Sequence, residues 1–250
     1  MILSERHGFI FVKGMKVAGT SVEIALSRLC GPDDIVTPIS PIDELARLAL
    51  GARCRNYAAD KAQEAPYLAR LRAAPPDALD ALPLPPPGYT NHMPLAAVAL
   101  RYGKDISRFR VVCVERSPYA KVISWANMQL SYGAYKVGGA MRADIAALKN
   151  AVDVGFQTGT IRDPRNIDRY RGPDGKVVAQ PMRYVSLAQD FAAFVAGLGV
   201  AEIPSLPHTK KGLLSESLEP REVFRPDQIK RINLLFREEF ETFGYEMIAP

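Results

Sequence analysis

The sequence predicts an α/β fold with a central, mostly parallel sheet flanked by helices. Short apolar runs typical of buried strands alternate along the chain with segments whose apolar residues recur at helical spacing. A glycine-bearing loop joins the first apolar run to a helix, an arrangement that suits phosphate binding in α/β proteins. With 250 residues and 48% hydrophobic content, the chain can bury a full core as a single domain, residues 1–250.

Three strands and eight helices follow from these patterns. Strands are expected at residues 10–12, 109–115 and 182–185, and helices at 22–29, 41–50, 60–73, 95–102, 118–130, 141–150, 187–196 and 226–243. Ser40 and Pro41 provide a cap and a first-turn proline for the second helix, as Ser117 and Pro118 do for the fifth. Residues 157–178 are rich in Arg, Asp, Pro and Gly, and they predict an irregular excursion.

Residues 51–88 have a different composition, rich in alanine and then in proline. The run from Pro83 to Gly88 predicts an extended surface segment. We interpret this region as an insertion over the core, either a lid that selects a ligand or a passive surface excursion.

Composition limits the classes of function. The net charge of +5 and the pI near 9.1 suit anionic ligands, although a solvated surface explains the same balance. Basic and aromatic residues do not alternate, so nucleic-acid binding is not expected.

The three cysteines, Cys30, Cys54 and Cys113, have no paired spacing. They predict buried thiols rather than a disulfide framework or a zinc site. No apolar run approaches 18 residues, so we expect a cytoplasmic protein without a membrane anchor.

The segment from Gly8 to Ser21, GFIFVKGMKVAGTS, carries the chemistry of an anion site. Gly19 lets the backbone approach an oxyanion closely, because a Cβ would stand in the way. Thr20 and Ser21 offer hydroxyl groups, and Lys16 adds a positive charge from within the loop. The spacing of Gly14 and Gly19 matches the nucleoside-triphosphate loop, but threonine stands where that loop has its lysine.

This segment resembles the 5′-phosphosulfate-binding motif of sulfotransferases that use 3′-phosphoadenosine 5′-phosphosulfate (PAPS), particularly the carbohydrate-type branch. The match covers Lys16, Val17, Ala18, Gly19, Thr20 and Ser21, with Met15 where proline is common. The resemblance extends weakly along most of the chain and implies a fold related to nucleotide kinases. It also implies PAPS as co-substrate without a metal, and 3′,5′-diphosphoadenosine as product. Many members of this family have a membrane anchor, and because this sequence has no apolar run of that length, we expect a soluble, bacterial-type member.

A second segment resembles the 3′-phosphate motif of the same family, R-[ND]-P-x-x-R-x-x-S. Arg116, Pro118 and Ser124 match it, Ser117 is a small change, and Lys121 stands for the second arginine. A guanidinium can bind a phosphate through two hydrogen bonds while the serine hydroxyl adds a third. A surface arginine and an unrelated helical serine are the alternative.

The third candidate is His92, which precedes the predicted helix 95–102. Relatives often carry a histidine near this place, close to the acceptor hydroxyl, and a neutral imidazole can remove a proton from an alcohol. A capping or surface histidine is the alternative, and His208 is the second candidate base.

The resemblance also implies that Lys210 and Lys211, in a late basic loop, contact the nucleotide. Val185 replaces a glutamate of the family pattern RYExLxxDF.

These observations predict sulfuryl transfer from PAPS to a hydroxyl, most simply on a carbohydrate or a small alcohol. Two other classes stay open at this point, namely a phosphotransferase that uses ATP and magnesium, and a nucleotide-binding module without catalysis. No aspartate ends the second strand, where a triphosphate enzyme places its magnesium ligand.

Overall fold

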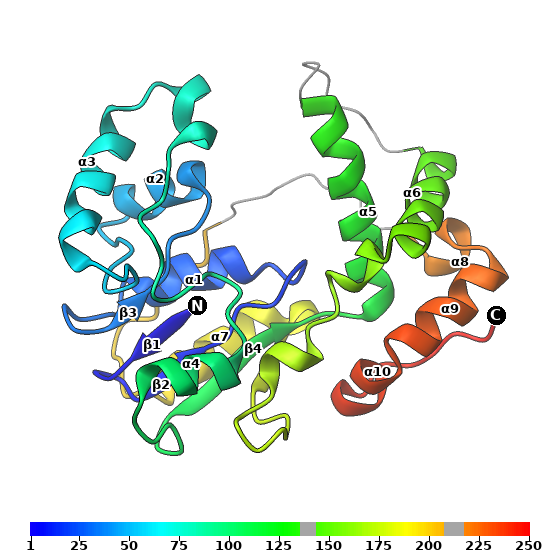
Figure 1. The fold of residues 1–250 in the computed structure, drawn as a ribbon. Helices are drawn as coiled ribbons and strands as arrows, with labels where there is room; N and C mark the ends of the chain where they lie inside the picture. Colours follow the sequence, from blue (N-terminus) through cyan, green and yellow to red (C-terminus); the bar gives the residue numbers. More distant parts are fainter. Residues whose placement is uncertain (136–143, 208–217) are drawn as a thin grey trace. The chain divides into compact units, whose positions relative to one another are not determined.

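The computed structural model describes residues 1–135, 144–207 and 218–250 (Figure 1). The chain divides into two compact units. The first, which we call the sheet unit, consists of Met1–Lys13, Ala18–Val114 and Asp168–Thr209. The second, the helical unit, consists of Gly14–Val17, Glu115–Ile167 and Lys210–Pro250.

A five-stranded mixed sheet forms the centre of the sheet unit. Its strands are β1 (Ile2–Ser4), β2 (Phe9–Phe11), β3 (Ile35–Val36), β4 (Arg110–Glu115) and β5 (Gln180–Arg183), in the order β3-β1-β2-β4-β5. The α/β class and the strands at β2, β4 and β5 agree with the sequence. The last residue of β4, Glu115, already belongs to the helical unit.

The expectation of a mostly parallel sheet is wrong. β2 and β4 pair in parallel, with Ile10 opposite Val111, but β1 runs antiparallel to both β2 and β3. Only four residues separate Ser4 from Phe9, whereas a parallel crossover needs about a dozen. Gly8 completes this tight turn at φ 63°, a conformation that glycine adopts without a steric penalty.

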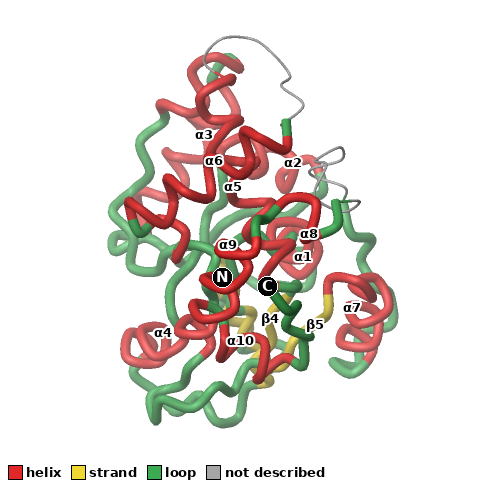
Figure 2. The backbone as a smooth tube through the Cα atoms, turned by 90° about the vertical axis from the view of Figure 1, so that its right-hand side faces the viewer, coloured by secondary structure: helices red, strands yellow, loops and turns green. Residues whose placement is uncertain are grey.

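Helices flank the sheet within this unit. They are α1 (Gly19–Ser27), α2 (Pro41–Ala49), α3 (Glu64–Ala73), α4 (Leu95–Tyr102) and α7 (Leu187–Ala196). The side chain of Ser40 accepts the amide of Asp43 and caps α2, as the sequence indicates. α7 packs against β5 (Figure 2), and its Phe194 contacts Phe9 of β2 edge to face at 5.7 Å between ring centroids.

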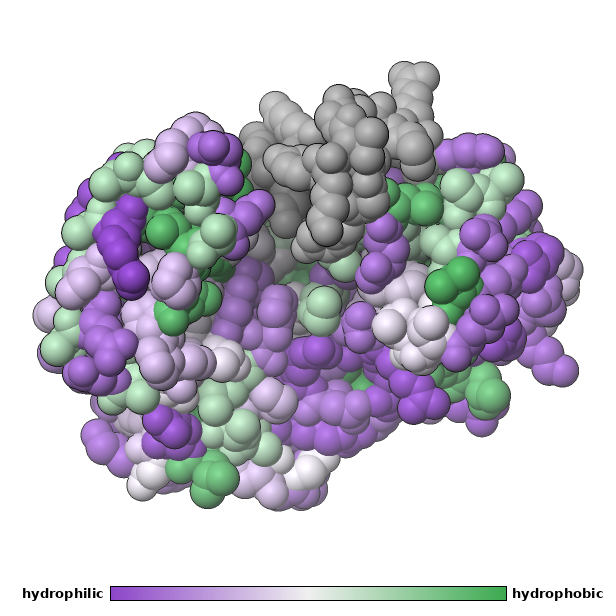
Figure 3. All heavy atoms as spheres, turned by 45° about the horizontal axis from the view of Figure 1, so that its top comes forward, coloured by the Kyte–Doolittle hydropathy of each residue, from purple (hydrophilic) through white to green (hydrophobic). Residues whose placement is uncertain are grey.

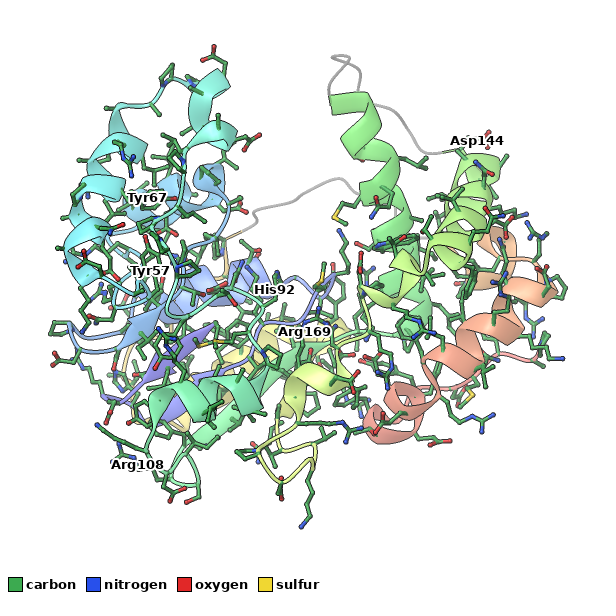
Figure 4. The ribbon with its side chains drawn as sticks, in the orientation of Figure 1. Tyr57, Tyr67, His92, Arg108, Asp144 and Arg169 are labelled. Carbon is green, nitrogen blue, oxygen red and sulfur yellow. The ribbon has the colours of Figure 1, made fainter. Side chains whose placement is uncertain are left out.

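Residues 51–88 build a small core of their own with α2. Tyr57 and Tyr67 are fully buried in it (Figure 4), together with Leu68 and Leu71 of α3, which the sequence places inward. The proline-rich stretch has no regular structure except a single bridge from Pro87 to Ala58. Whether this region selects an acceptor stays a prediction.

The helical unit contains, among its described residues, α5 (Pro118–Tyr135), α6 (Ile145–Thr158), α8 (Pro220–Val223), α9 (Pro226–Leu235) and α10 (Arg237–Phe243). Their apolar faces meet around Trp125, which is almost fully buried. The helix expected at 141–150 instead begins at Ile145, because Asp144 (Figure 4) caps it, and it continues to Thr158. Residues 136–143 lie outside the described part.

The last expected helix, 226–243, is two helices. Phe236 leaves helical geometry at φ −104° and ψ 12°, and this divides α9 from α10. Its side chain is nevertheless fully buried, as is Phe240 one turn later, so both segments contribute to one core. The predicted apolar stripe is therefore correct, although the helix that carries it is interrupted.

Two short 3₁₀ turns lie within the irregular excursion, at Thr160–Arg162 and Ile167–Tyr170. The three cysteines are buried free thiols. No helix among the described residues is long and apolar enough to cross a membrane. On the face shown in Figure 3, hydrophobic residues occur in small groups among hydrophilic ones, which is ordinary for a protein surface.

Gly155 of α6 gives a test of the helical core. A Cβ at this position would lie 2.2 Å from Cη2 of Trp125, so Gly155→Ala should lower the free energy of unfolding by about 1–3 kcal/mol. Helix propensity alone predicts the opposite sign, a gain of about 1 kcal/mol. Urea unfolding followed by circular dichroism measures the difference. Val154→Ala, at the neighbouring exposed position, should stay within about 0.5 kcal/mol of wild type; a stabilised Gly155→Ala variant would contradict this packing.

Candidate functional site

The loop between β2 and α1 has an unusual backbone. Lys16 and Ala18 adopt left-handed conformations at φ 63° and 62°, and only one other non-glycine residue in the described ranges, Asn56, has a positive φ. This conformation costs an L-residue roughly 1–2 kcal/mol. Strained residues of this kind cluster at ligand-binding sites, where the surrounding structure holds them. The two strained positions fall within the segment that the sequence predicts to bind phosphate.

Helix α1 begins at Gly19, directly after this loop. Ala18 is its N-cap residue and has no side-chain group that could accept a hydrogen bond from the first turn, and no acidic side chain lies in that turn. The first N–H groups of a helix have no partner within the helix, and the dipole adds about half a positive charge there. Gly19 is buried, while Thr20 and Ser21 are half-buried. The geometry expected for an anion site is thus present locally at this helix end.

His92 lies just before α4 (Figure 4), and the carbonyl of Lys13 fixes its ring. Nδ1 is 3.0 Å from that carbonyl oxygen. Since a carbonyl only accepts, Nδ1 carries the hydrogen and Nε2 keeps its lone pair. Burial, reinforced by the positive charge of Lys13, lowers the pKa of His92 from 6.5 to about 4. The imidazole is therefore neutral at physiological pH, with Nε2 able to accept a proton.

Lys13 itself is held by a buried carboxylate that the sequence analysis did not single out. Its Nζ lies 2.8 Å from Oε2 of Glu23 in α1, and both side chains are almost completely buried. Glu23 also faces the N-terminal ammonium at 2.7 Å and Arg47 at 3.6 Å. Burial opposes ionisation of Glu23, but Lys13, the ammonium and Arg47 together hold its pKa well below the usual range. The sequence did carry one sign of this buried carboxylate, because Glu23 stands among the apolar residues of the helix that follows the loop.

The helical unit contains the residues of the second motif. Arg116 follows β4 and is 7% exposed, and Ser124 on α5 is 8% exposed. Lys121, which stands for the second arginine of the motif, is fully buried, and its Nζ lies 2.7 Å from Glu115 and 2.6 Å from Glu239.

The proposed site residues are distributed over both units. Lys16, Val17, Arg116 and Ser124 belong to the helical unit, whereas Ala18, Gly19, Thr20, Ser21 and His92 belong to the sheet unit. Lys210, Lys211 and His208 lie outside the described residues.

Two arginines of the irregular excursion, residues 157–178, form ion pairs. Arg165 pairs with Glu238 at 3.0 Å, and Arg171 pairs with Asp168 at 3.5 Å. Val185, at the position of the family glutamate, is 89% exposed.

Comparisons of this chain with protein-family models, with curated proteins and with solved structures find no match. Among the described residues, no group of three or more His, Cys, Asp or Glu side chains is arranged to hold a metal ion.

The tautomer and pKa of His92 can be measured directly. Its ring should stay neutral between pH 6 and 8 and titrate near pH 4 in an NMR titration assigned with a His92→Gln variant. Because folding lowers this pKa, the unfolded chain binds the proton first as the pH falls below 6.5. The stability of wild type relative to His92→Gln should therefore decrease between pH 6.5 and 4. A midpoint near 6.5 in the folded protein would contradict the buried, Lys13-bound geometry.

Proposed function

We propose that this protein is a PAPS-dependent sulfotransferase that transfers a sulfuryl group to a hydroxyl of a carbohydrate or a small alcohol. The observation that carries the proposal is the left-handed backbone of Lys16 and Ala18 immediately before the N-terminus of α1. It coincides with the residues that match the family's 5′-phosphosulfate motif. Successive backbone N–H groups in such a loop, together with a helix N-terminus, form a concave binding site for an oxyanion.

In the proposed reaction the loop holds the 5′-phosphate of the donor. Backbone N–H groups from Val17 to Gly19 and the hydroxyls of Thr20 and Ser21 donate hydrogen bonds to its oxygens. The ammonium of Lys16 lies at the oxygen that bridges phosphorus and sulfur, where negative charge grows as the S–O bond breaks. Arg116 and Ser124 bind the 3′-phosphate, and the late basic residues Lys210 and Lys211 add contacts to the nucleotide.

His92 acts as the base. Its Nε2 accepts the proton of the acceptor hydroxyl while the acceptor oxygen forms a bond to sulfur, and 3′,5′-diphosphoadenosine leaves with the bridging oxygen. The hydrogen bond from Nδ1 to the carbonyl of Lys13 supports this role, because it fixes the tautomer and orients the ring. A low pKa keeps the base unprotonated before the substrates bind.

The first experiment measures nucleotide binding by calorimetry in the presence of EDTA. Wild type should prefer 3′,5′-diphosphoadenosine over 5′-AMP, which lacks the 3′-phosphate. Arg116→Ala should weaken binding of the diphosphate by about 10- to 100-fold, the value of a charge-assisted hydrogen-bonded pair, and should leave 5′-AMP binding unchanged. Arg108→Ala, which removes a surface arginine paired with Glu5, is the control and should keep the preference. Binding that requires ATP with magnesium would instead identify a phosphotransferase.

The second experiment measures transfer of labelled sulfate from PAPS to a pool of hydroxyl-bearing carbohydrates. His92→Ala should reduce the transfer rate by about 10²- to 10⁴-fold without weakening binding of 3′,5′-diphosphoadenosine. His7→Ala is the matched control, because the ring of His7 bonds to the carbonyl of Leu29 among the described residues and is not part of the proposed site. Unchanged transfer by His92→Ala would exclude His92 as the base. Normal nucleotide binding without transfer to any acceptor would favour the non-catalytic module.

A further inference from the structure

We propose that Asn166 is a positioning residue that holds the phosphate loop in its binding conformation through the backbone of Met15. This inference rests on the proposed function, because it assigns the loop to anion binding. Asn166 is not part of either sequence motif and lies in the excursion before Ile167–Tyr170. It is fully buried, and every contact used below lies within the helical unit.

The amide side chain of Asn166 binds residue 15 on both sides. Its Oδ1 accepts the N–H of Met15 at 2.7 Å, and its Nδ2 donates to the carbonyl of Met15 at 3.1 Å. These are the two backbone hydrogen bonds that a neighbouring strand would supply to one residue. A side chain 151 positions away therefore restrains the backbone on both sides of Met15.

The side chain of Asn166 with its two hydrogen bonds to Met15, which we call the clamp, is itself held by a buried network of charged groups. Nδ2 of Asn166 also donates to Oε1 of Glu115 at 3.1 Å, and its backbone N–H donates to Oε1 of Glu239. Lys121 bridges the remaining oxygens of the two glutamates. All four side chains are fully buried. Rotation of the Asn166 side chain away from Met15 would therefore break the charge-assisted bond to Glu115 as well as both bonds to Met15, in a low-dielectric interior.

The consequence for the loop lies at the next residue. Lys16 has φ 63°, and the peptide that precedes this torsion is the one whose carbonyl Asn166 holds. A left-handed lysine is costly, and it persists only where the surrounding structure holds it in that conformation. Asn166 supplies this restraint and so orders Lys16 before an anion binds, which reduces the entropy lost on binding.

The residue type is specific to this role. Asparagine offers an acceptor and two donors on one short side chain, and all three positions are used here. Aspartate has the same shape but lacks both donors, and it would face Glu115 with a like charge.

The test is a double-mutant cycle with Lys16→Ala, read by binding of 3′,5′-diphosphoadenosine. Asn166→Ala should weaken binding about tenfold in the wild-type background and less than about twofold in the Lys16→Ala background, because the clamp acts through Lys16. Asn166→Asp, which retains Oδ1, should behave similarly and serves if the alanine variant does not fold. Asn127→Ala, at another buried asparagine on α5, is the control and should leave binding within about twofold. Equal losses in both backgrounds would overturn the proposal and leave Asn166 with a general structural role.

Hydrogen exchange of the Met15 amide separates this inference from the proposed function. The amide should be protected in wild type and in Asn127→Ala, and it should exchange at least about tenfold faster in Asn166→Ala, or in Asn166→Leu if the alanine variant does not fold, because both remove the Oδ1 that accepts this N–H. If wild type does not bind 3′,5′-diphosphoadenosine, the proposed function fails, and the exchange result alone decides whether the clamp exists. Equal exchange in wild type and in the variant that lacks Oδ1 would overturn the clamp whatever the ligand.

Discussion

The strained loop between β2 and α1 is the constraint on which the candidate site depends. Two left-handed residues within three positions cost a few kcal/mol together, so local sequence preference cannot maintain them. The restraint comes from buried polar groups in each unit. In the sheet unit, Glu23 holds the side chain of Lys13 at the start of the loop. In the helical unit, Asn166 holds the backbone of Met15.

Both restraints use buried charge, which is an expensive way to stabilise a fold. Removing an ion pair from water costs several kcal/mol per ion, and a packed apolar pair of similar volume is often at least as stable. The ionic groups here do something that apolar residues cannot do. The ammonium of Lys121 sets the positions of two carboxylates, and one of those carboxylates orients the amide of Asn166. These buried polar groups therefore fix directions that apolar packing would leave undetermined.

Local signals in the sequence predicted most of the secondary structure. Ser40 before Pro41 and Gly103 after Tyr102 marked helix ends that the structure shows at the same residues. The strand directions were not predictable in the same way, because the short strand at Ile2–Ser4 was missed, and with it the four-residue turn that forces an antiparallel pair. The interruption at Phe236 carries no glycine or proline, so the sequence had no local mark of it.

For the candidate site, the sequence indicated residue types but not the groups that orient them. Lys16, Gly19 and His92 stood out because their chemistry or spacing is recognisable in isolation. Asn166 and Glu23 act through partners that only folding brings near, 151 and 10 positions away in the chain. Lys121 likewise has partners that the sequence did not indicate, since carboxylates six and 118 positions away bind its ammonium.

The environment of His92 links the loop to the chemistry of the proposed reaction. Burial lowers the pKa of the His92 imidazole, and the positive charge of Lys13 lowers it further, so the free protein has a base that is unprotonated but weak. In the proposed reaction the donor brings several negative charges to the adjoining loop. Negative charge raises the pKa of an imidazole, so the basicity of Nε2 would increase when the donor binds. A base tuned in this way stays neutral before the donor arrives and gains proton affinity at the stage when the acceptor hydroxyl must lose its proton.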